Sequence, residues 1–220
     1  MPRVVALPAV AIDGHLPSTD ANADHPMRVM TRRAAGLGGA PWDAEAAALV
    51  AGLFDALAPE WHDRESPQRT AVVTDALERG LDRVRPGGTG GTAVEVGSGL
   101  GTYSPLIGRR FATTLAVELA GEMHRRARPS PAHRVLADAS RLPVPDGSVD
   151  AVVMINAFLF PTEVRRVLRP GGALLWVNSS GERTPIHLGT EDLVAALGFP
   201  VSGVESRAGA ATWCALRRES

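Results

Sequence analysis

The pattern of apolar and polar positions divides the chain into three parts. Residues 1–40 are rich in Ala, Gly, Pro, Asp and Asn without sustained periodicity, which predicts a flexible or loosely docked leader. From Asp43, apolar residues recur at the spacing of an amphipathic helix that stops at Pro59, and a second such helix is predicted over about 67–84. We therefore expect residues 41–88 to form an N-terminal helical cap.

Residues 89–220 follow a different pattern, in which short apolar runs alternate with helical segments. Apolar strands separated by helices are typical of a mostly parallel sheet that is covered on both faces. Two further strands, near 201–207 and 212–218, are separated by a tight turn and predict a hairpin. The expected fold class is α/β, with a doubly wound, mostly parallel seven-stranded sheet and an antiparallel C-terminal hairpin. The other strands are expected near 92–96, 114–118, 134–137, 149–156 and 173–178, and the intervening helices near 103–111, 121–127, 163–169 and 191–197.

Composition narrows the possible chemistry. The 220 residues are 45% hydrophobic with a net charge of −1, which fits one packed domain and predicts no nucleic-acid partner. All 23 basic residues are Arg, so no mechanism that needs a lysine is available. The single cysteine, Cys214, excludes an internal disulfide and a multi-cysteine metal site and suits a cytoplasmic setting. We expect no metal and no membrane span, while monomer and homodimer both remain open.

The glycine-rich segment from Val94 to Gly101 is the strongest candidate for a ligand-binding loop. It reads Val-Glu-Val-Gly-Ser-Gly-Leu-Gly and lies between a predicted strand and a predicted helix. Glycines allow positive φ and leave no Cβ to block a ligand, and the helix that follows presents unpaired N–H groups. Taken alone, such a loop is also compatible with a tight turn that binds nothing.

Three acidic residues make a specific ligand more plausible. Glu118 ends the next predicted strand, where a carboxylate accepts hydrogen bonds from both hydroxyls of a ribose. Asp138 ends the strand after that and is placed to accept a hydrogen bond from an adenine amino group. Glu95 lies within the loop itself, where it would repel a pyrophosphate but suits a ligand with an ammonium and a sulfonium. This pattern disfavours a nicotinamide-dependent oxidoreductase.

At these residues the chain resembles the class I S-adenosylmethionine-dependent methyltransferases. Residues 94–104 look like motif I of that family, and 116–123 resemble its second strand and turn. Residues 137–150 are similar to its adenine loop, and 166–172 to the turn before its fifth strand. The resemblance is closest to the small-molecule branch known as methyltransferase type 11, which is similar to the ubiquinone and menaquinone enzymes.

This resemblance implies S-adenosylmethionine as cofactor and a role for each matching residue. The implied contacts are Glu95, Gly97, Ser98, Gly99 and Gly101 around the methionine moiety, Glu118 on the ribose, Leu119 and Met123 on the adenine face, Asp138 and Ala139 on the adenine edge, and Asn156 near the amino group and the transferable methyl.

Catalytic residues are harder to predict. Between Asn156 and Arg166 the chain is shorter than the family pattern, which usually has a helix and one or two His residues there. Methyl transfer needs alignment more than a base. If a base is used, the candidates are His62 and Asp63, between the two cap helices, and His187, after the fifth strand.

Several functions therefore stay open. The leading hypothesis is a methyltransferase that acts on an oxygen, nitrogen or carbon atom of a small molecule. The alternatives are a methyltransferase that acts on RNA or protein, and a protein of the same fold that binds the cofactor without methylating.

Overall fold

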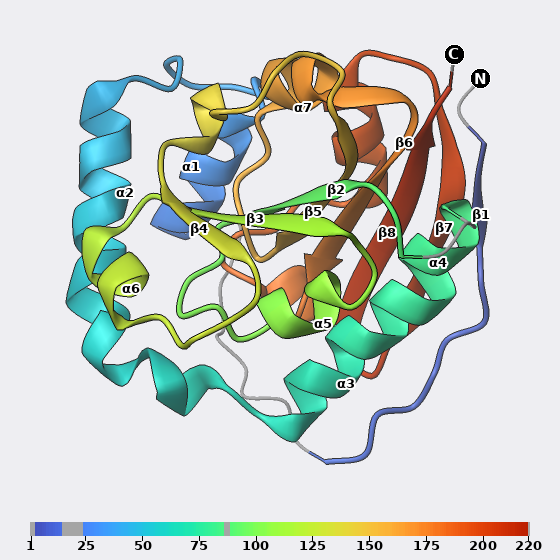
Figure 1. The fold of residues 1–220 in the computed structure, drawn as a ribbon, viewed down its shortest axis with the longest axis horizontal. Coiled ribbons are helices and arrows are strands. Elements are labelled where there is room, and N and C mark those ends of the chain that lie inside the picture. Colours follow the sequence, from blue (N-terminus) through green and yellow to red (C-terminus); the bar gives the residue numbers. More distant parts are fainter. Residues whose placement is uncertain (1–2, 15–23, 86–88, 220) are drawn as a thin grey trace.

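The computed structural model describes residues 3–14, 24–85 and 89–219, and within them the strands form one mixed sheet (Figure 1). The strands are β1 (Arg3–Ala6), β2 (Thr92–Val96), β3 (Thr113–Glu118), β4 (His133–Leu136), β5 (Val149–Ile155), β6 (Leu168–Asn178), β7 (Val201–Ala208) and β8 (Ala211–Arg218). Their order across the sheet is β1-β7-β8-β6-β5-β2-β3-β4. All neighbours are parallel except β8, which runs antiparallel to both β6 and β7. The doubly wound sheet with an antiparallel C-terminal hairpin is confirmed, with eight described strands in place of the expected seven.

Helices cover both faces of this sheet. They are α1 (Pro26–Ala34), α2 (Ala44–Leu57), η1 (Ala58–Arg64), α3 (Pro67–Asp75), η2 (Ala76–Leu81), α4 (Asp82–Val84), α5 (Ser104–Gly108), α6 (Gly121–Arg126), η3 (Ala139–Arg141), α7 (Pro161–Val167), η4 (Gly181–Arg183) and α8 (Thr190–Leu197). The run from α3 through η2 to α4 is the second predicted cap helix, and it lies beside the sheet together with α5 (Figure 1). Pro59 does not end the first cap helix outright, because the chain continues as the tighter helix η1, with this proline in its first turn.

Two apolar layers result from the alternation of side chains along the strands. On β5, Val153 belongs to the layer packed against α3, η2 and α5, whereas Val152 and Met154 belong to the layer packed against α7 and α8. The neighbours on β6 and β8 alternate in the same way, with Trp213 in the first layer and Trp176 in the second. These central strands are covered on both faces, which is why their sequences are continuously apolar.

The N-terminal part differs from the expected leader. Residues 3–6 form β1, which adds to the sheet edge in parallel with β7, and residues 26–34 form α1. Four residues are too few to show the alternation that identifies a strand, so this edge strand could not be recognised from its sequence. Part of the predicted leader, 15–23, and the boundary residues 86–88 lie outside the described residues.

An arginine group holds α1 to the rest of the molecule. Arg28 donates to the backbone carbonyls of Glu182 and Thr184 at 2.5 and 3.0 Å. Arg32 pairs with Asp192 at 2.8 Å, and the next residue, Arg33, contacts the segment that leads into α2. The segment from α1 into α2 is therefore docked on the loops that follow β6.

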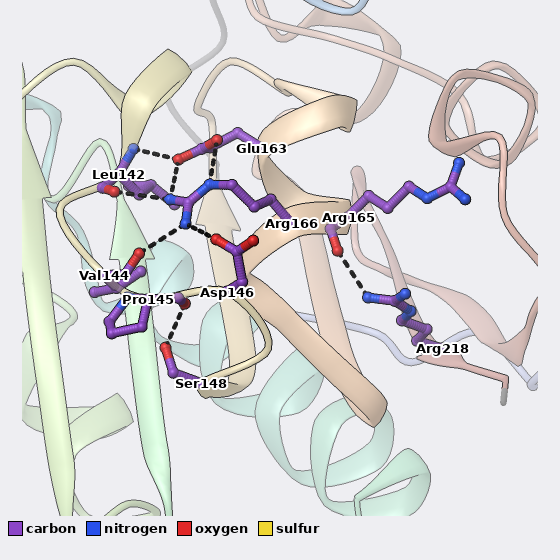
Figure 2. Close-up of polar contacts among 9 residues, drawn as sticks. All are labelled: Leu142, Val144, Pro145, Asp146, Ser148, Glu163, Arg165, Arg166 and Arg218. Carbon is purple, nitrogen blue, oxygen red and sulfur yellow. Dashed lines mark hydrogen bonds and ion pairs between the residues drawn. The ribbon is translucent and has the colours of Figure 1, made fainter.

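A further arginine, on α7, fixes the loop that follows β4. The Arg166 guanidinium, on α7, donates to the carbonyls of Leu142 and Val144, both at 2.9 Å, and to the carboxylates of Asp146 and Glu163, both at 2.6 Å (Figure 2). Glu163 is buried and accepts in turn from the Leu142 backbone N–H at 2.5 Å. The loop that follows Asp138 is thus bonded to α7 at both its backbone and its side chains.

Candidate functional site

One pocket lies over the carboxyl ends of β2, β3, β4 and β5, where parallel α/β sheets bind their ligands. It encloses about 1070 Å³ of space free of atoms, its open mouth included. The floor is formed by the strand ends and the glycine loop, and the walls come from α2, η1, the start of α3 and the segment after β5. The helical cap predicted over 41–88 therefore supplies part of the pocket wall.

The glycine loop adopts the backbone conformation that its sequence predicts. Gly97, Gly99 and Gly101 all have positive φ, at 67°, 54° and 75°. A Cβ on Gly97 would come within 3.0 Å of the Ala157 Cβ, so the close approach of these two segments requires glycine there as well. Of these three glycines, Gly97 and Gly99 line the pocket, whereas Gly101 lies behind the loop and is buried.

Glu95 is buried beneath this loop, and its pKa is higher than that of an exposed glutamate. Its side chain is 3% exposed and lines the pocket, and its Oε2 accepts from the Ser104 hydroxyl at 2.5 Å. Burial raises the pKa of Glu95 to about 7, against the opposing effects of the Ser104 hydrogen bond and the nearby Arg134 guanidinium. A cationic group entering the pocket would favour the ionised carboxylate.

Glu118 connects the glycine loop to the end of β3. Its two carboxylate oxygens accept from the backbone N–H groups of Gly99 and Ala120, each at 2.8 Å. Burial raises the pKa of Glu118, while these backbone hydrogen bonds and the charge of Arg134 act in the opposite direction. The Leu119 backbone N–H also bonds this carboxylate, and the acceptor capacity that remains is available to a hydroxyl group in the pocket.

Asp138 is held from two sides at the end of β4. Its Oδ1 accepts from the Ser140 backbone N–H at 2.8 Å, which starts the short helix η3. Its Oδ2 accepts from the indole N–H of Trp42 at 3.0 Å. Trp42 comes from the segment between α1 and α2 and packs on Phe158 and Phe160, at ring-centroid distances of 5.5 and 5.0 Å. No pattern in the sequence predicts this contact between residues 96 positions apart.

Asn156 braces the ends of β5 and β6. Its side-chain Nδ2 donates to the Ser179 hydroxyl at 2.8 Å, and its Oδ1 accepts from the Ser179 backbone N–H at 2.9 Å. Among the described residues it is the one non-glycine with positive φ, at 51°. Asparagine tolerates this conformation better than most residues, and such backbones gather at functional sites.

An aromatic and charged wall completes the pocket. Trp61 on η1 packs edge-on against Phe54 at 5.6 Å, and the Arg64 guanidinium lies 5.1 Å from the centre of the Trp61 ring. Tyr103 lines the pocket too, and burial raises its pKa to about 12. Further wall residues that sequence analysis did not select are Val50, Glu65, Arg69, Thr102 and Ile186. Thr102 and Tyr103 lie in the segment that resembles motif I, and Trp61 is the neighbour of His62, so only the segments of these three residues could be singled out from the sequence.

The pocket brings together ten of the eleven predicted cofactor residues. Gly101 is the exception, as described above. The ten are Glu95, Gly97, Ser98, Gly99, Glu118, Leu119, Met123, Asp138, Ala139 and Asn156. They come from four strand ends separated by up to 61 positions in the sequence, so the convergence is a property of the fold.

The three candidate bases do not join them. His62 and Asp63 are 61% and 69% exposed at their side chains and pair with each other at 3.0 Å. The tight helix η1 turns Trp61 and Arg64 inward and leaves the two intervening residues outward, because its residues three apart share a face. His187 lies outside this pocket and lines a separate hollow beside β6, β7 and β8, whereas its neighbour Ile186 faces the site.

Comparison with known proteins identifies the family. A model described as a methyltransferase domain matches residues 94–176, from the glycine loop into β6. A solved structure of an S-adenosylmethionine-dependent methyltransferase from Aquifex aeolicus has the same fold, with a TM-score of 0.59 at 18% identity over 73% of this chain and 98% of that one. Residues 94–176 therefore form a domain of the class I S-adenosylmethionine-dependent methyltransferase type. The cofactor of this family is S-adenosylmethionine.

Two relatives of this methyltransferase are enzymes named for ribosomal RNA. A Micromonospora griseorubida protein named as a 23S rRNA (guanine-N(1)-)-methyltransferase is 34% identical over 157 residues, which is 66% of this chain and 52% of the relative. The 23S rRNA (guanine(748)-N(1))-methyltransferase of Streptomyces fradiae is 33% identical over 134 residues, 59% of this chain and 46% of the relative. The chain thus spans about half the length of these curated relatives.

The residues of the methyltransferase pocket fit the family's cofactor. The loop offers a cradle that a Cβ on Gly97 would fill, and the buried Ser98 hydroxyl within it has no hydrogen-bond partner among the described residues. Acidic side chains stand at three strand ends, which suits a ligand that presents an ammonium, a ribose diol and an adenine amino group. Within the same described residues, no helix combines the length and the apolar character needed to cross a membrane.

Proposed function

We propose that the chain transfers the methyl group of S-adenosylmethionine to a small-molecule acceptor that carries a planar aromatic ring. The observation that carries this proposal is the continuity of one pocket from the predicted cofactor residues to an aromatic wall. An aromatic wall favours flat, unsaturated rings, which stack on it or meet it edge-on.

The cofactor-binding roles follow from the groups that each strand end presents. Glu95 and the backbone of Gly97–Gly99 would hold the methionine moiety, with the buried carboxylate facing its ammonium. Glu118 would bind the ribose hydroxyls through the lone pairs that its backbone contacts leave free. Asp138 and Ala139 would hold the adenine edge, with Leu119 and Met123 against its face. When bound, the cofactor would supply an electrophilic methyl group on a sulfonium, and S-adenosylhomocysteine would be the leaving group when an acceptor atom takes that methyl in line.

Alignment rather than a base accounts for catalysis in this proposal. The described residues that line the pocket include no His, and the pocket is covered by α2 and η1. Holding an acceptor atom in line with the methyl supplies much of the rate enhancement in a displacement of this kind. Trp61 and Phe54 would fix the acceptor ring, while Arg64, Arg69 and Glu65 offer charged groups at its edge.

A guanine base in RNA is a second candidate, and the two curated relatives favour it. Guanine is itself a planar ring, so the same aromatic wall would suit it. The net charge of −1 weighs against an extended RNA interface, because RNA binding depends on neutralising phosphates. We therefore rank the small-molecule acceptor first.

The test has two stages. Calorimetric titration with S-adenosylhomocysteine should show binding, and Glu118→Ala should weaken it by at least about tenfold, since hydrogen bonds to the ribose are lost. Binding of NADH but not of S-adenosylhomocysteine would overturn the proposal. In the second stage, methyl-labelled cofactor is offered with guanosine, simple phenols and indoles, or 23S rRNA. Label in the free aromatic compounds supports the first candidate, and label in rRNA guanine supports the second.

A further inference from the structure

Trp42 lies outside every segment that resembles the family, yet it contacts the carboxylate at the adenine end of the pocket. Its indole N–H donates to Asp138 Oδ2 at 3.0 Å, and the other carboxylate oxygen is held by the Ser140 backbone N–H. With one donor on each oxygen, the carboxylate is fixed in one orientation. Its remaining lone pairs are the ones offered to the pocket.

The chain around Trp42 is itself held in place. The Arg33 guanidinium donates to the Pro41 carbonyl through Nε and Nη2, at 2.9 and 2.6 Å, and to Asp43 Oδ2 at 2.9 Å. Asp43 Oδ1 accepts from the Ala46 N–H at 2.8 Å and so caps α2. The residues on both sides of Trp42 are therefore clamped by one arginine, which restricts where the indole can point.

The ring of Trp42 is positioned as firmly as its backbone. It packs at 46° on Phe158 and at 74° on Phe160, the two aromatic residues that follow β5. These contacts hold the indole plane, so its N–H approaches Asp138 from one direction. The Arg33 contacts and the aromatic packing therefore both fix Trp42, whose N–H in turn bonds one carboxylate oxygen of Asp138.

From this geometry we infer that Trp42 is a specificity-determining residue, which orients Asp138 so that the pocket selects an adenine amino group over a purine carbonyl. A carboxylate accepts hydrogen bonds but donates none, so it binds the amino group of adenine and repels the carbonyl oxygen of hypoxanthine. How strongly it discriminates depends on whether its free lone pair points at that position. The inference rests on the proposed function, because it takes Asp138 as the adenine contact.

The test compares S-adenosylhomocysteine with S-inosylhomocysteine, in which a carbonyl replaces the amino group and the adjacent ring nitrogen N1 carries a proton. Each is titrated by calorimetry into the full chain and into Trp42→Phe, which keeps an aromatic ring and removes the N–H. We expect the wild-type chain to prefer the adenosyl ligand and the variant to lose about tenfold of that preference. The loss should come from weaker binding of the adenosyl ligand, with the inosyl ligand nearly unchanged.

Two further variants test the contacts that hold the indole in place. Phe160→Leu loosens the packing of the indole plane but keeps its N–H, and should reduce the preference for the adenosyl ligand by less than Trp42→Phe does. Arg33→Leu removes the clamp but leaves the indole intact, and should reduce the preference in the same direction as Trp42→Phe. Thermal unfolding of each variant checks that the chain is folded at the titration temperature.

Three outcomes would overturn the inference. The first is a Trp42→Phe variant that binds both ligands more weakly by the same factor, as expected if Trp42 is purely structural. The second is a variant that binds the adenosyl ligand more tightly, which would mean that Trp42 competes with adenine for Asp138. The third is a variant whose preference equals that of the wild type. In each case wild-type binding of S-adenosylhomocysteine would leave the proposed function standing, whereas absence of that binding would refute the proposed function itself.

Discussion

Glu95→Gln should make the protein more stable and a poorer binder of its cofactor, and both effects should depend on pH. The side chain is 3% exposed, and burial raises its pKa from 4.5 to about 7. Glutamine has nearly the same shape as protonated glutamate and cannot ionise. The substitution therefore removes the titration while disturbing the packing around Ser104 little.

The sign and the size of the stability change follow from the linkage between folding and proton binding. Below pH 4.5 the residue is protonated in both the folded and the unfolded chain, and its burial costs no charge. As the pH rises towards 7 the unfolded chain ionises first, so the wild type loses stability until its folded-state pKa is passed. A shift from 4.5 to about 7 corresponds to a loss of about 3 kcal/mol. The glutamine variant has no such loss.

The assay is urea unfolding of wild type and variant at several pH values between 4.5 and 8.5. We expect the variant's stability relative to wild type to increase by about 3 kcal/mol over this range, with most of the change between pH 5 and 7. Glu60→Gln, on the exposed surface of η1, is the matched control and should show no comparable trend. A Glu95→Gln difference that stays constant with pH would refute this account of the buried carboxylate.

Cofactor binding should respond in the opposite direction. An ammonium group beside Glu95 favours the ionised carboxylate, so wild-type affinity for S-adenosylhomocysteine should increase up to about pH 7 and then level off. The glutamine variant should bind more weakly and lose this pH dependence. Stability gained together with affinity lost is the trade-off expected of a functional residue.

Further predictions concern the loops and the residues outside the pocket. Gly97→Ala should destabilise the chain by about 1–2 kcal/mol and weaken S-adenosylhomocysteine binding, because alanine is strained at φ 67°; thermal unfolding and calorimetry measure both. Arg166→Leu should lower stability by about 3 kcal/mol in urea unfolding, since it leaves the buried Glu163 carboxylate without its cation. His62→Ala should change cofactor affinity less than about twofold in the same titration, because its side chain is largely exposed.

The sheet could be predicted because its signals are local and repeated. Apolar runs, glycine turns and helix spacing predict β2–β5, β7 and β8 to within one or two residues, whereas β6 begins at Leu168, five residues before the predicted start, and includes the predicted turn at 170–172. The predicted cofactor residues lie at the carboxyl ends of β2–β5. The edge strand β1 escaped prediction for a physical reason. It has only four residues, which is too short a run to show the alternation of apolar and polar side chains that identifies a strand.

The pocket walls were harder to predict than its floor. The floor consists of loops with glycines at positive φ and acidic residues at strand ends. These residue types can be recognised in the sequence. Trp42, Phe54 and Trp61 are ordinary apolar residues of cap helices and loops, and a helix shows only that it has an apolar face, not what that face covers. The position of the candidate bases relative to the pocket could not be predicted for the same reason. His62 and Trp61 are neighbours in the sequence, and only the geometry of η1 decides which of them turns inward.

The features that cost this chain stability gather at the ends of β2 and β5. Glu95 is a buried carboxylate, Ser98 has a buried hydroxyl without a partner among the described residues, and Asn156 holds a positive φ. Packing alone explains neither the buried carboxylate nor the unpartnered hydroxyl, since apolar side chains would fill those positions at lower cost, whereas Asn156 also holds β5 to β6 through Ser179. Under the proposed function, the ammonium group of the cofactor would account for the first, and a backbone that passes close to the cofactor would account for the third. On that proposal, stability is lost at these positions because the site is arranged to bind S-adenosylmethionine.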